Sequence, residues 1–381
     1  MKCNSVGRAL VAVLLVCVPL AARAACDDPP APKVDWRFCD KVRADLRKAD
    51  LEGANLQGAN LRGVDLEKAN LRGALLERAN LRNARLSGAE MAGAFLAGAT
   101  LRGADLSHAN LASADLKGAS LAGADLAKAR IENATLEGVN LMGARLAGVD
   151  LRGASLPGAD LSGLDLRGVD LEAALLNGAD LSGANLQGAN LKLALVRRAN
   201  LSGADLSAAT LEGANLLGSK LVGTKLAGAN LSSANLMLAV LTGADLKEAN
   251  LTVADLGEAD LRDANLQGAD LERGIVMGAD LRGARLRGAK LRGLVLMEAD
   301  LRGVDLAGLN LEYALLSQSR LTGANLQGAA LKGTDMTEAD LTGANLAGAN
   351  PQEAILEDAT LEGATWSDGR VCAAGSTGEC R

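Results

Sequence analysis

The chain has 381 residues, of which 49% belong to the set AVILMFWYC but only 1% are aromatic, and its formal charge at pH 7 is −6. A globular enzyme of this length normally fills its core with many aromatic rings, so two Phe, two Trp and one Tyr exclude such a core. The apolar content also excludes a disordered chain, which needs low hydrophobicity and a large unbalanced charge. The composition predicts a narrow core in which one or two small residue types recur many times.

Residues 1–24 have the features of an export signal. Lys2 and Arg8 precede an apolar run, and Ala22-Arg23-Ala24 places small residues where signal peptidase requires them. The run is too short for a comfortable membrane span, and no later segment approaches one. We therefore expect a periplasmic or secreted protein with no membrane span. Cleavage removes three basic residues and no acid, which lowers the net charge from −6 to −9.

Four of the six cysteines remain after this cleavage, two at each end of the mature chain. An even number of cysteines in an exported chain indicates disulfides. If the chain folds as the long rod that the repeat described below predicts, its two ends lie far apart. We therefore expect local pairs, Cys26 with Cys39 in an N-terminal cap (25–43) and Cys372 with Cys380 in a C-terminal cap (367–381). A metal site is the weaker alternative, since these cysteines have neither CxxC spacing nor histidine partners.

Residues 44–366 repeat every five residues without insertion or deletion. Of the 64 positions in this phase between 46 and 361, 58 are Leu; Ala usually lies two residues earlier, Asn or Asp one residue earlier, and Gly two residues later. A period of five fits neither a helix nor a long strand. Ala and Leu can both point inward from a short extended segment, and Gly permits a corner. The repeat therefore predicts an all-β solenoid with flat walls.

The number of walls follows from the exceptions at the polar position before Leu. Nine large apolar residues occur there, and eight of them are separated by multiples of twenty: Leu75, Phe95, Leu175, Leu195, Ile275, Val295, Leu315 and Ile355. Equivalent walls would scatter these residues over four phases. We therefore expect four pentapeptides per coil, a square cross-section and about 16 coils.

The register of Ala, Asn or Asp, Leu, a variable residue and Gly resembles the pentapeptide-repeat family over residues 44–366. This resemblance implies a right-handed quadrilateral β-helix, in agreement with the usual handedness of crossover connections. The tail from Trp366 to Cys380 is similar to tails of exported family members. Such a tail is expected to cover the open strand edges at the end of the solenoid.

Some cytosolic members that this chain resembles bind DNA gyrase by mimicking duplex DNA. About 16 coils with roughly 4.8 Å between stacked strands make a rod about 80 Å long. B-DNA carries one charge per about 1.7 Å, so a mimic of this length needs roughly 45 negative charges. The mature chain has a net charge of only −9. DNA mimicry is therefore the least favoured partner hypothesis, and we expect no nucleic-acid binding.

The inventory of catalytic residues is poor, because His108 is the only histidine and falls at a corner of the repeat. We expect no enzymatic activity and no cofactor. Asp260, Asp280 and Asp300 are better candidates for chemistry, since they fall on one wall in successive coils and each has an Arg two residues later. Stacked carboxylates could hold a hard cation such as calcium. The favoured interpretation is a ladder of ion pairs.

Apolar residues at outward positions predict an interaction surface. If the coils stack as expected, a contiguous stripe contains Leu175, Leu195, Leu217, Met237, Leu238, Ile275, Met277, Val295, Met297 and Leu315. Exposed apolar patches of this extent often mark contact sites. We therefore expect a rigid, non-catalytic scaffold whose stripe binds a protein partner or a second copy of the chain. The alternative from another class is a solenoid that binds cations or small ligands.

Overall fold

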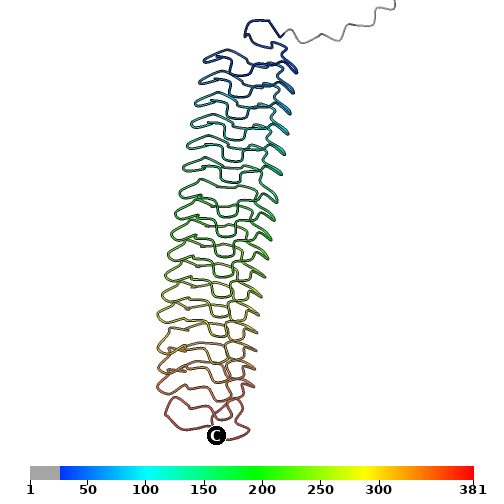
Figure 1. Cartoon of the computed structure of the whole chain (residues 1–381). Helices are drawn as coiled ribbons and strands as arrows, with labels where there is room; N and C mark the ends of the chain where they lie inside the picture. Colours follow the sequence, from blue (N-terminus) through cyan, green and yellow to red (C-terminus); the bar gives the residue numbers. More distant parts are fainter. Residues whose placement is uncertain (1–25) are drawn as a thin grey trace, which may run out of the picture.

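The computed structural model describes residues 26–381, which form one elongated stack of coils (Figure 1). The expected export signal, residues 1–24, lies outside the described residues. Within the described part there is no helix, and each pentapeptide contributes one bridge residue and a two-residue turn. The parallel bridges join residues twenty apart, from Asp35–Asn55 to Asn345–Thr365, which is the period expected from the sequence. Since the described part has no helix, residues 26–381 contain no helix that could span a membrane.

One pentapeptide unit explains the whole stack. The Leu51 carbonyl accepts a hydrogen bond from the Ala54 N–H at 3.0 Å, and this turn places Gly53 at a φ of 62°. A positive φ at the third residue of a turn is a conformation that Gly adopts without steric cost. The Leu56 N–H then donates to the Leu75 carbonyl of the next coil at 2.7 Å. Ala54 and Leu56 both point inward and are fully buried, so the core consists of stacked Ala and Leu columns.

The Asn or Asp before each Leu completes the hydrogen bonding of the unit. The turn and the ladder leave one backbone donor unused, which is the N–H of the residue after Leu. Gln57 N–H donates to Asn55 Oδ1 at 3.3 Å, and Ser182 N–H donates to Asp180 Oδ1 at 2.9 Å. A short polar side chain that accepts from the backbone two residues later forms an Asx turn. The local backbone therefore favours Asn and Asp at this position.

The stack begins before the boundary expected at residue 44. Its first bridge is at Asp35, Trp36 occupies a Leu position with 0% exposure, and Cys39 occupies an Ala position with 1% exposure. The expected separate cap over 25–43 is therefore corrected, because its second half is already part of the first coil. The Leu pattern hid this, since Trp and Cys fill the inward positions. The Cys26–Cys39 disulfide, with a Cα–Cα distance of 5.4 Å, ties the leading segment to this coil.

The C-terminal residues 367–381 fold back over the last coil. Val371 forms an antiparallel bridge with Thr365, and Thr377 forms one with Thr360. A disulfide joins Cys372 and Cys380, whose exposures are 2% and 8%. This segment therefore pairs with the strand edge at which the coils end, and a paired edge does not invite another chain.

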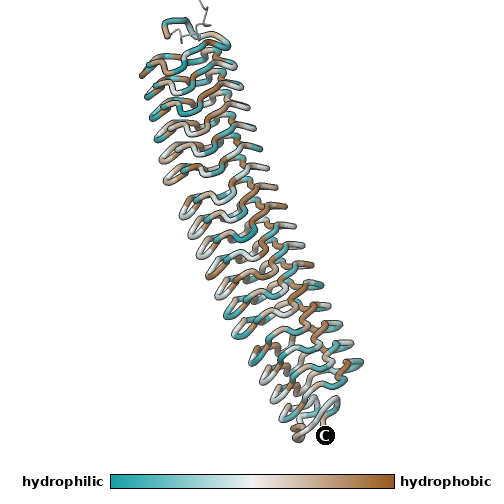
Figure 2. Tube along the Cα trace, turned by 90° about the vertical axis from the view of Figure 1, so that its right-hand side faces the viewer, coloured by the Kyte–Doolittle hydropathy of each residue, from teal (hydrophilic) through white to brown (hydrophobic). Residues whose placement is uncertain are grey.

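The ladder between coils is interrupted in two places. Among residues 26–381 the bridges 145–165, 285–305 and 290–310 are missing from the series. At both places a Leu occupies an inward position that usually holds Ala, namely Leu164 over Ala144 and Leu309 over Ala289. Val alone is tolerated there, since Val64 lies over Ala44 and the bridge 45–65 is present. Extra methylenes in a packed core force the backbone apart. Figure 2 shows the first interruption as a wider gap between coils about a third of the way down the rod.

Candidate interaction surface

The predicted partner residues lie on one wall of the rod. We call it the Leu175 wall; it consists of the bridge residues in the series 35, 55, 75 up to 355 and the two-residue corner on each side. Leu175 bridges Leu195, and Val295 bridges both Ile275 and Leu315, so these side chains stack directly. Six of the ten predicted residues are exposed: Leu175, Leu195, Leu238, Ile275, Met277 and Leu315. The other four, Leu217, Met237, Val295 and Met297, are half-buried.

The stripe is not continuous along the centre of the wall, because Asn215, Asn235 and Asp255 occupy three successive bridge positions. A corner column of Leu217, Met237, Met277 and Met297 continues past them. Gly257 lies in the middle of this column, and a Cβ there would lie 3.7 Å from Met237 Cγ. A Cβ at this distance would make ordinary van der Waals contact with Met237, so the glycine is a gap in the column that the methionine does not require.

Large apolar residues also occupy corners where Gly is usual, and of these the predicted stripe includes only Leu238. Within residues 26–381 there are five such residues with positive φ, and all lie on the two corners of the Leu175 wall: Phe38, Leu193, Leu238, Val253 and Tyr313. Val253 is β-branched, has a φ of 59° and is 58% exposed. This conformation is strained for a β-branched residue. A scan for large apolar residues at the Gly position of the repeat would have found all five.

The apolar residues on this wall weaken the unit that carries them. Ile275 and Val295 cannot accept a hydrogen bond from the N–H groups of Met277 and Met297, as Asn or Asp would at their positions. Of the sixteen exposed large apolar side chains within residues 26–381, twelve lie on this wall or its corners. Solvent-exposed apolar side chains contribute little to folding. The stability of the fold therefore does not account for this surface.

The carboxylates considered for a cation lie on the neighbouring wall and are already engaged. In each of Asp260, Asp280 and Asp300 the Oδ2 atom lies 2.6 Å from Nη2 of the Arg two residues later. The hydrogen bond from Arg262 lowers the pKa of Asp260 to about 2, and the corresponding guanidinium groups lower the pKa values of Asp280 and Asp300. In the described chain no three His, Cys, Asp or Glu residues are placed to hold a metal ion. The arrangement is an ion-pair ladder.

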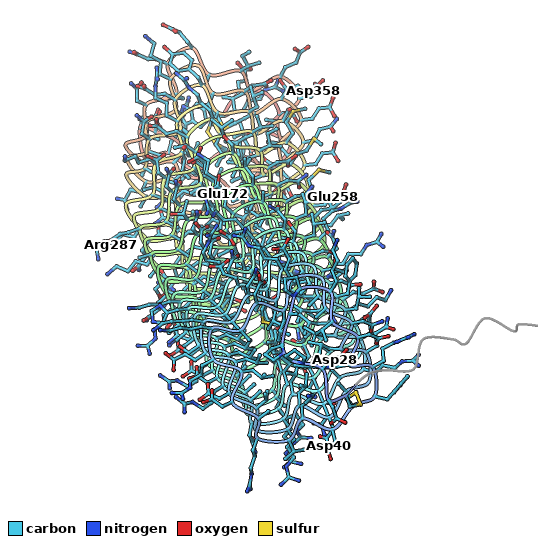
Figure 3. All side chains as sticks on the ribbon, turned by 90° about the horizontal axis from the view of Figure 1, so that it is seen from above. Asp28, Asp40, Glu172, Glu258, Arg287 and Asp358 are labelled. Atoms are coloured by element: carbon cyan, nitrogen blue, oxygen red, sulfur yellow. A yellow bond between two sulfur atoms is a disulfide. The ribbon has the colours of Figure 1, made fainter. Side chains whose placement is uncertain are left out.

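Other charged groups surround the rod without converging. Figure 3, viewed down the rod, shows Arg287 and Glu258 pointing outward on opposite sides. His108 lies exposed at a corner with a φ of 58°. Nucleophilic catalysis needs a base held against a second group in a cleft, and an exposed corner does not provide this.

Comparison with known families agrees with this geometry. The family model described as "Pentapeptide repeats" matches in overlapping copies over residues 42–236, 239–275 and 279–365. The chain belongs to the pentapeptide-repeat family. Members of this family fold as right-handed quadrilateral β-helices, which is the fold class expected from the sequence.

Solved structures of family members share parts of the chain. HetL, a pentapeptide repeat protein involved in heterocyst differentiation regulation from the cyanobacterium Nostoc sp. strain PCC 7120, is 36% identical over 57% of this chain and 92% of its own, with a TM-score of 0.33. Rfr23 from the cyanobacterium Cyanothece 51142 is 38% identical over 25% of this chain and 58% of its own, with a TM-score of 0.17. A member from the thylakoid lumen of Arabidopsis thaliana is 27% identical over 37% of this chain and 70% of its own, with a TM-score of 0.18. No curated protein matches the chain.

Proposed function

We propose that this protein is an exported, non-catalytic scaffold that binds a protein partner through the Leu175 wall. The carrying observation is the strained, exposed Val253 among four other large apolar residues at corners of the same wall. Backbone strain that the fold does not need points to a function. Apolar area of this kind is typical of contact surfaces.

Export is supported by the chemistry of the two ends. Disulfides persist in oxidising compartments and are rare in reducing ones. One disulfide lies at each end of the rod, between Cys26 and Cys39 and between Cys372 and Cys380. A periplasmic or secreted protein would keep both.

Crosslinking in cells tests the proposed surface. The wild type is compared with a triple variant, Met237→Asp, Met277→Asp and Met297→Asp, and crosslinked proteins are identified by mass spectrometry. We expect the wild type to yield a crosslinked protein that the triple variant loses, because three carboxylates would have to be desolvated at the contact. Both proteins must give the same circular dichroism spectrum.

A matched control places the same charge on the opposite wall. The control variant carries Ser207→Asp, Ala227→Asp and Gln267→Asp. These three residues are partly exposed and lie at a corner far from the Leu175 wall. This control should keep the wild-type crosslinks. Identical crosslinks from all three proteins would show that the Leu175 wall is not the contact surface.

A further inference from the structure

We propose that the partner of the Leu175 wall is a second copy of this chain, bound antiparallel about a two-fold axis that crosses the coil containing Val253 and Gly257. This inference rests on the proposed function, because it names the partner of the same surface. It follows from the two corners of the wall, which differ in chemistry.

One corner carries a column of charges and the other a column of apolar side chains. The charged column has alternating signs and is interrupted only by Ser232 and Thr252; its members are Glu172, Lys192, Glu212, Glu272, Arg292, Glu312 and Lys332. The apolar column consists of Leu217, Met237, Met277 and Met297. The side chains of Lys192 and Arg292 are 39% and 49% exposed, although each is paired along the column, with Lys192 Nζ 3.0 Å from Glu212 Oε1 and Arg292 Nε 3.7 Å from Glu312 Oε2.

The unlike corners decide the orientation of the two rods. A closed dimer through one wall has a two-fold axis, which lies either along the rods or across them. An axis along the rods makes them parallel and places each charged corner against an apolar corner, with Arg292 opposite Met297. That arrangement would bury charges against apolar groups. An axis across the rods makes them antiparallel and brings each corner against its own copy.

The alternating signs then decide the register. With the axis at Thr252, residues of the charged column face one another when their numbers sum to 504. Lys192 therefore faces Glu312, and Glu212 faces Arg292. Glu172 faces Lys332 in the same register. A shift of the partner by one coil in one direction makes three pairs like-charged, for example Lys192 against Arg292. A shift in the other direction places Lys192 against Lys332 and Glu212 against Glu312. Complementary charges fix the register of an interface in this way.

The same register also pairs apolar side chains. Leu195 meets Leu315 on the wall, Leu193 meets Tyr313 at the charged corner, and Met237 meets Met277 at the apolar corner. Val253 lies on the axis and contacts its own copy, so the residue with the strained backbone lies at the centre of the proposed interface. Asp255 and Glu258 also face their own copies, and Leu175 faces Asp335; the two like-charge contacts and this apolar–charged contact oppose dimerisation.

The size of the wall sets the expected affinity. Seven strand spacings from Leu175 to Leu315 amount to about 34 Å, and five residues across the wall span at most about 16 Å. The contact is therefore about 550 Å² per chain, below the roughly 800 Å² of a standard interface. We expect a reversible dimer that dissociates on dilution.

Sedimentation velocity of the disulfide-bonded mature chain over a range of concentrations tests the proposal. One variant carries Lys192→Glu and Arg292→Glu, and the other carries Glu212→Lys and Glu312→Lys. In the proposed register each variant alone places like charges at four contacts, whereas an equimolar mixture places opposite charges at all four. We expect each variant alone to be monomeric at concentrations where the wild type dimerises, and the mixture to form heterodimers.

Two further variants sharpen this test. Arg262→Glu with Arg282→Glu reverses two charges on the neighbouring wall and should leave dimerisation unchanged. Asp255→Asn with Glu258→Gln removes both like-charge contacts at the axis and should lower the concentration of half-dimerisation about tenfold. In a register shifted by one coil Asp255 faces Asn235 or Ile275 instead of its own copy, so the same variant would remove no like-charge contact and should strengthen the dimer less.

The outcomes separate this inference from the proposed function. A mixture that stays monomeric while the wild type dimerises would overturn the antiparallel register. A wild type that is monomeric at every concentration would overturn the second copy as partner. The scaffold function then stands if crosslinks to another protein are lost in the triple Met variant. A monomeric wild type whose crosslinks are also found in the triple Met variant would overturn both proposals.

Discussion

At the scale of single residues, inward and outward positions have opposite tolerances. The core is only as wide as facing Leu and Ala columns, so an inward side chain has no alternative site. Leu186 has 0% exposure in the middle of the rod. Arg282, by contrast, lies outward with 44% of its side chain exposed, although it is paired with Asp280.

Leu186→Asp should therefore lower the free energy of unfolding by several kcal/mol, because it buries an unpaired charge and removes packing. Arg282→Ala should change that free energy by less than about 1 kcal/mol, as expected for an exposed ion pair. Denaturant unfolding monitored by circular dichroism measures both. Equal losses in the two variants would contradict the inward and outward assignment.

At the scale of the pentapeptide and the coil, the sequence predicted the unit but not every boundary. The fixed spacing of Leu and Ala predicted the turns, the inward columns and the stacking of Leu175 on Leu195, because each follows from a strict period. The start of the stack was missed, since Trp36 and Cys39 fill Leu and Ala positions. The interruptions of the ladder were missed because inward bulk becomes visible only when Leu164 is stacked on Ala144.

The interrupted coils should exchange their amide hydrogens faster than their neighbours. The N–H groups of Leu121, Gly123 and Leu126 donate to the next coil at 2.8 to 2.9 Å. The equivalent N–H groups of Leu141, Gly143 and Leu146 have no such acceptor within residues 26–381. Amide hydrogen exchange followed by mass spectrometry should show lower protection for the second set, because protection requires a closed hydrogen bond. Equal protection would mean that the coils close in solution.

At the scale of the whole molecule, the surface could be predicted only in part. The apolar stripe was visible in the sequence as exceptions twenty residues apart. The corner residues Leu193, Val253 and Tyr313 were not predicted, although each occupies the Gly position of the repeat, because the predicted stripe was built from exceptions at the position before Leu and from the residues beside them. The two unlike corners emerge only when seven or more coils are stacked, which no local pattern reveals.

Acid should destabilise the rod over a defined pH range. The pKa of Asp260 falls to about 2 through its hydrogen bonds with Arg262, and Asp280 and Asp300 shift in the same direction. A lowered native pKa contributes stability that is present above the unfolded value of about 3.9 and is lost as the pH falls through the native value. The melting temperature should therefore decline between about pH 4 and pH 2.

Thermal melts of the wild type and of a variant with Asp260→Asn, Asp280→Asn and Asp300→Asn measure this effect. The variant should lose less stability than the wild type between pH 4 and pH 2, and the difference should be small because the pairs are partly exposed. Calcium should leave both melting temperatures unchanged, since a ligand raises stability only if it binds the native state. A rise with calcium would restore the cation-binding hypothesis.

The two interruptions also determine how the rod responds to force. Each coil contacts only its neighbours, so a pull along the axis is borne in series and the weakest junction separates first. Those junctions lie between residues 145 and 165 and between 285 and 305, on the wall opposite Leu175, and the second extends to residues 290 and 310 on an adjoining wall. The bridges on the Leu175 wall remain closed at both places. Under load or bending the rod would behave as three stiff segments joined by two hinges, and the middle segment carries the centre of the contact surface.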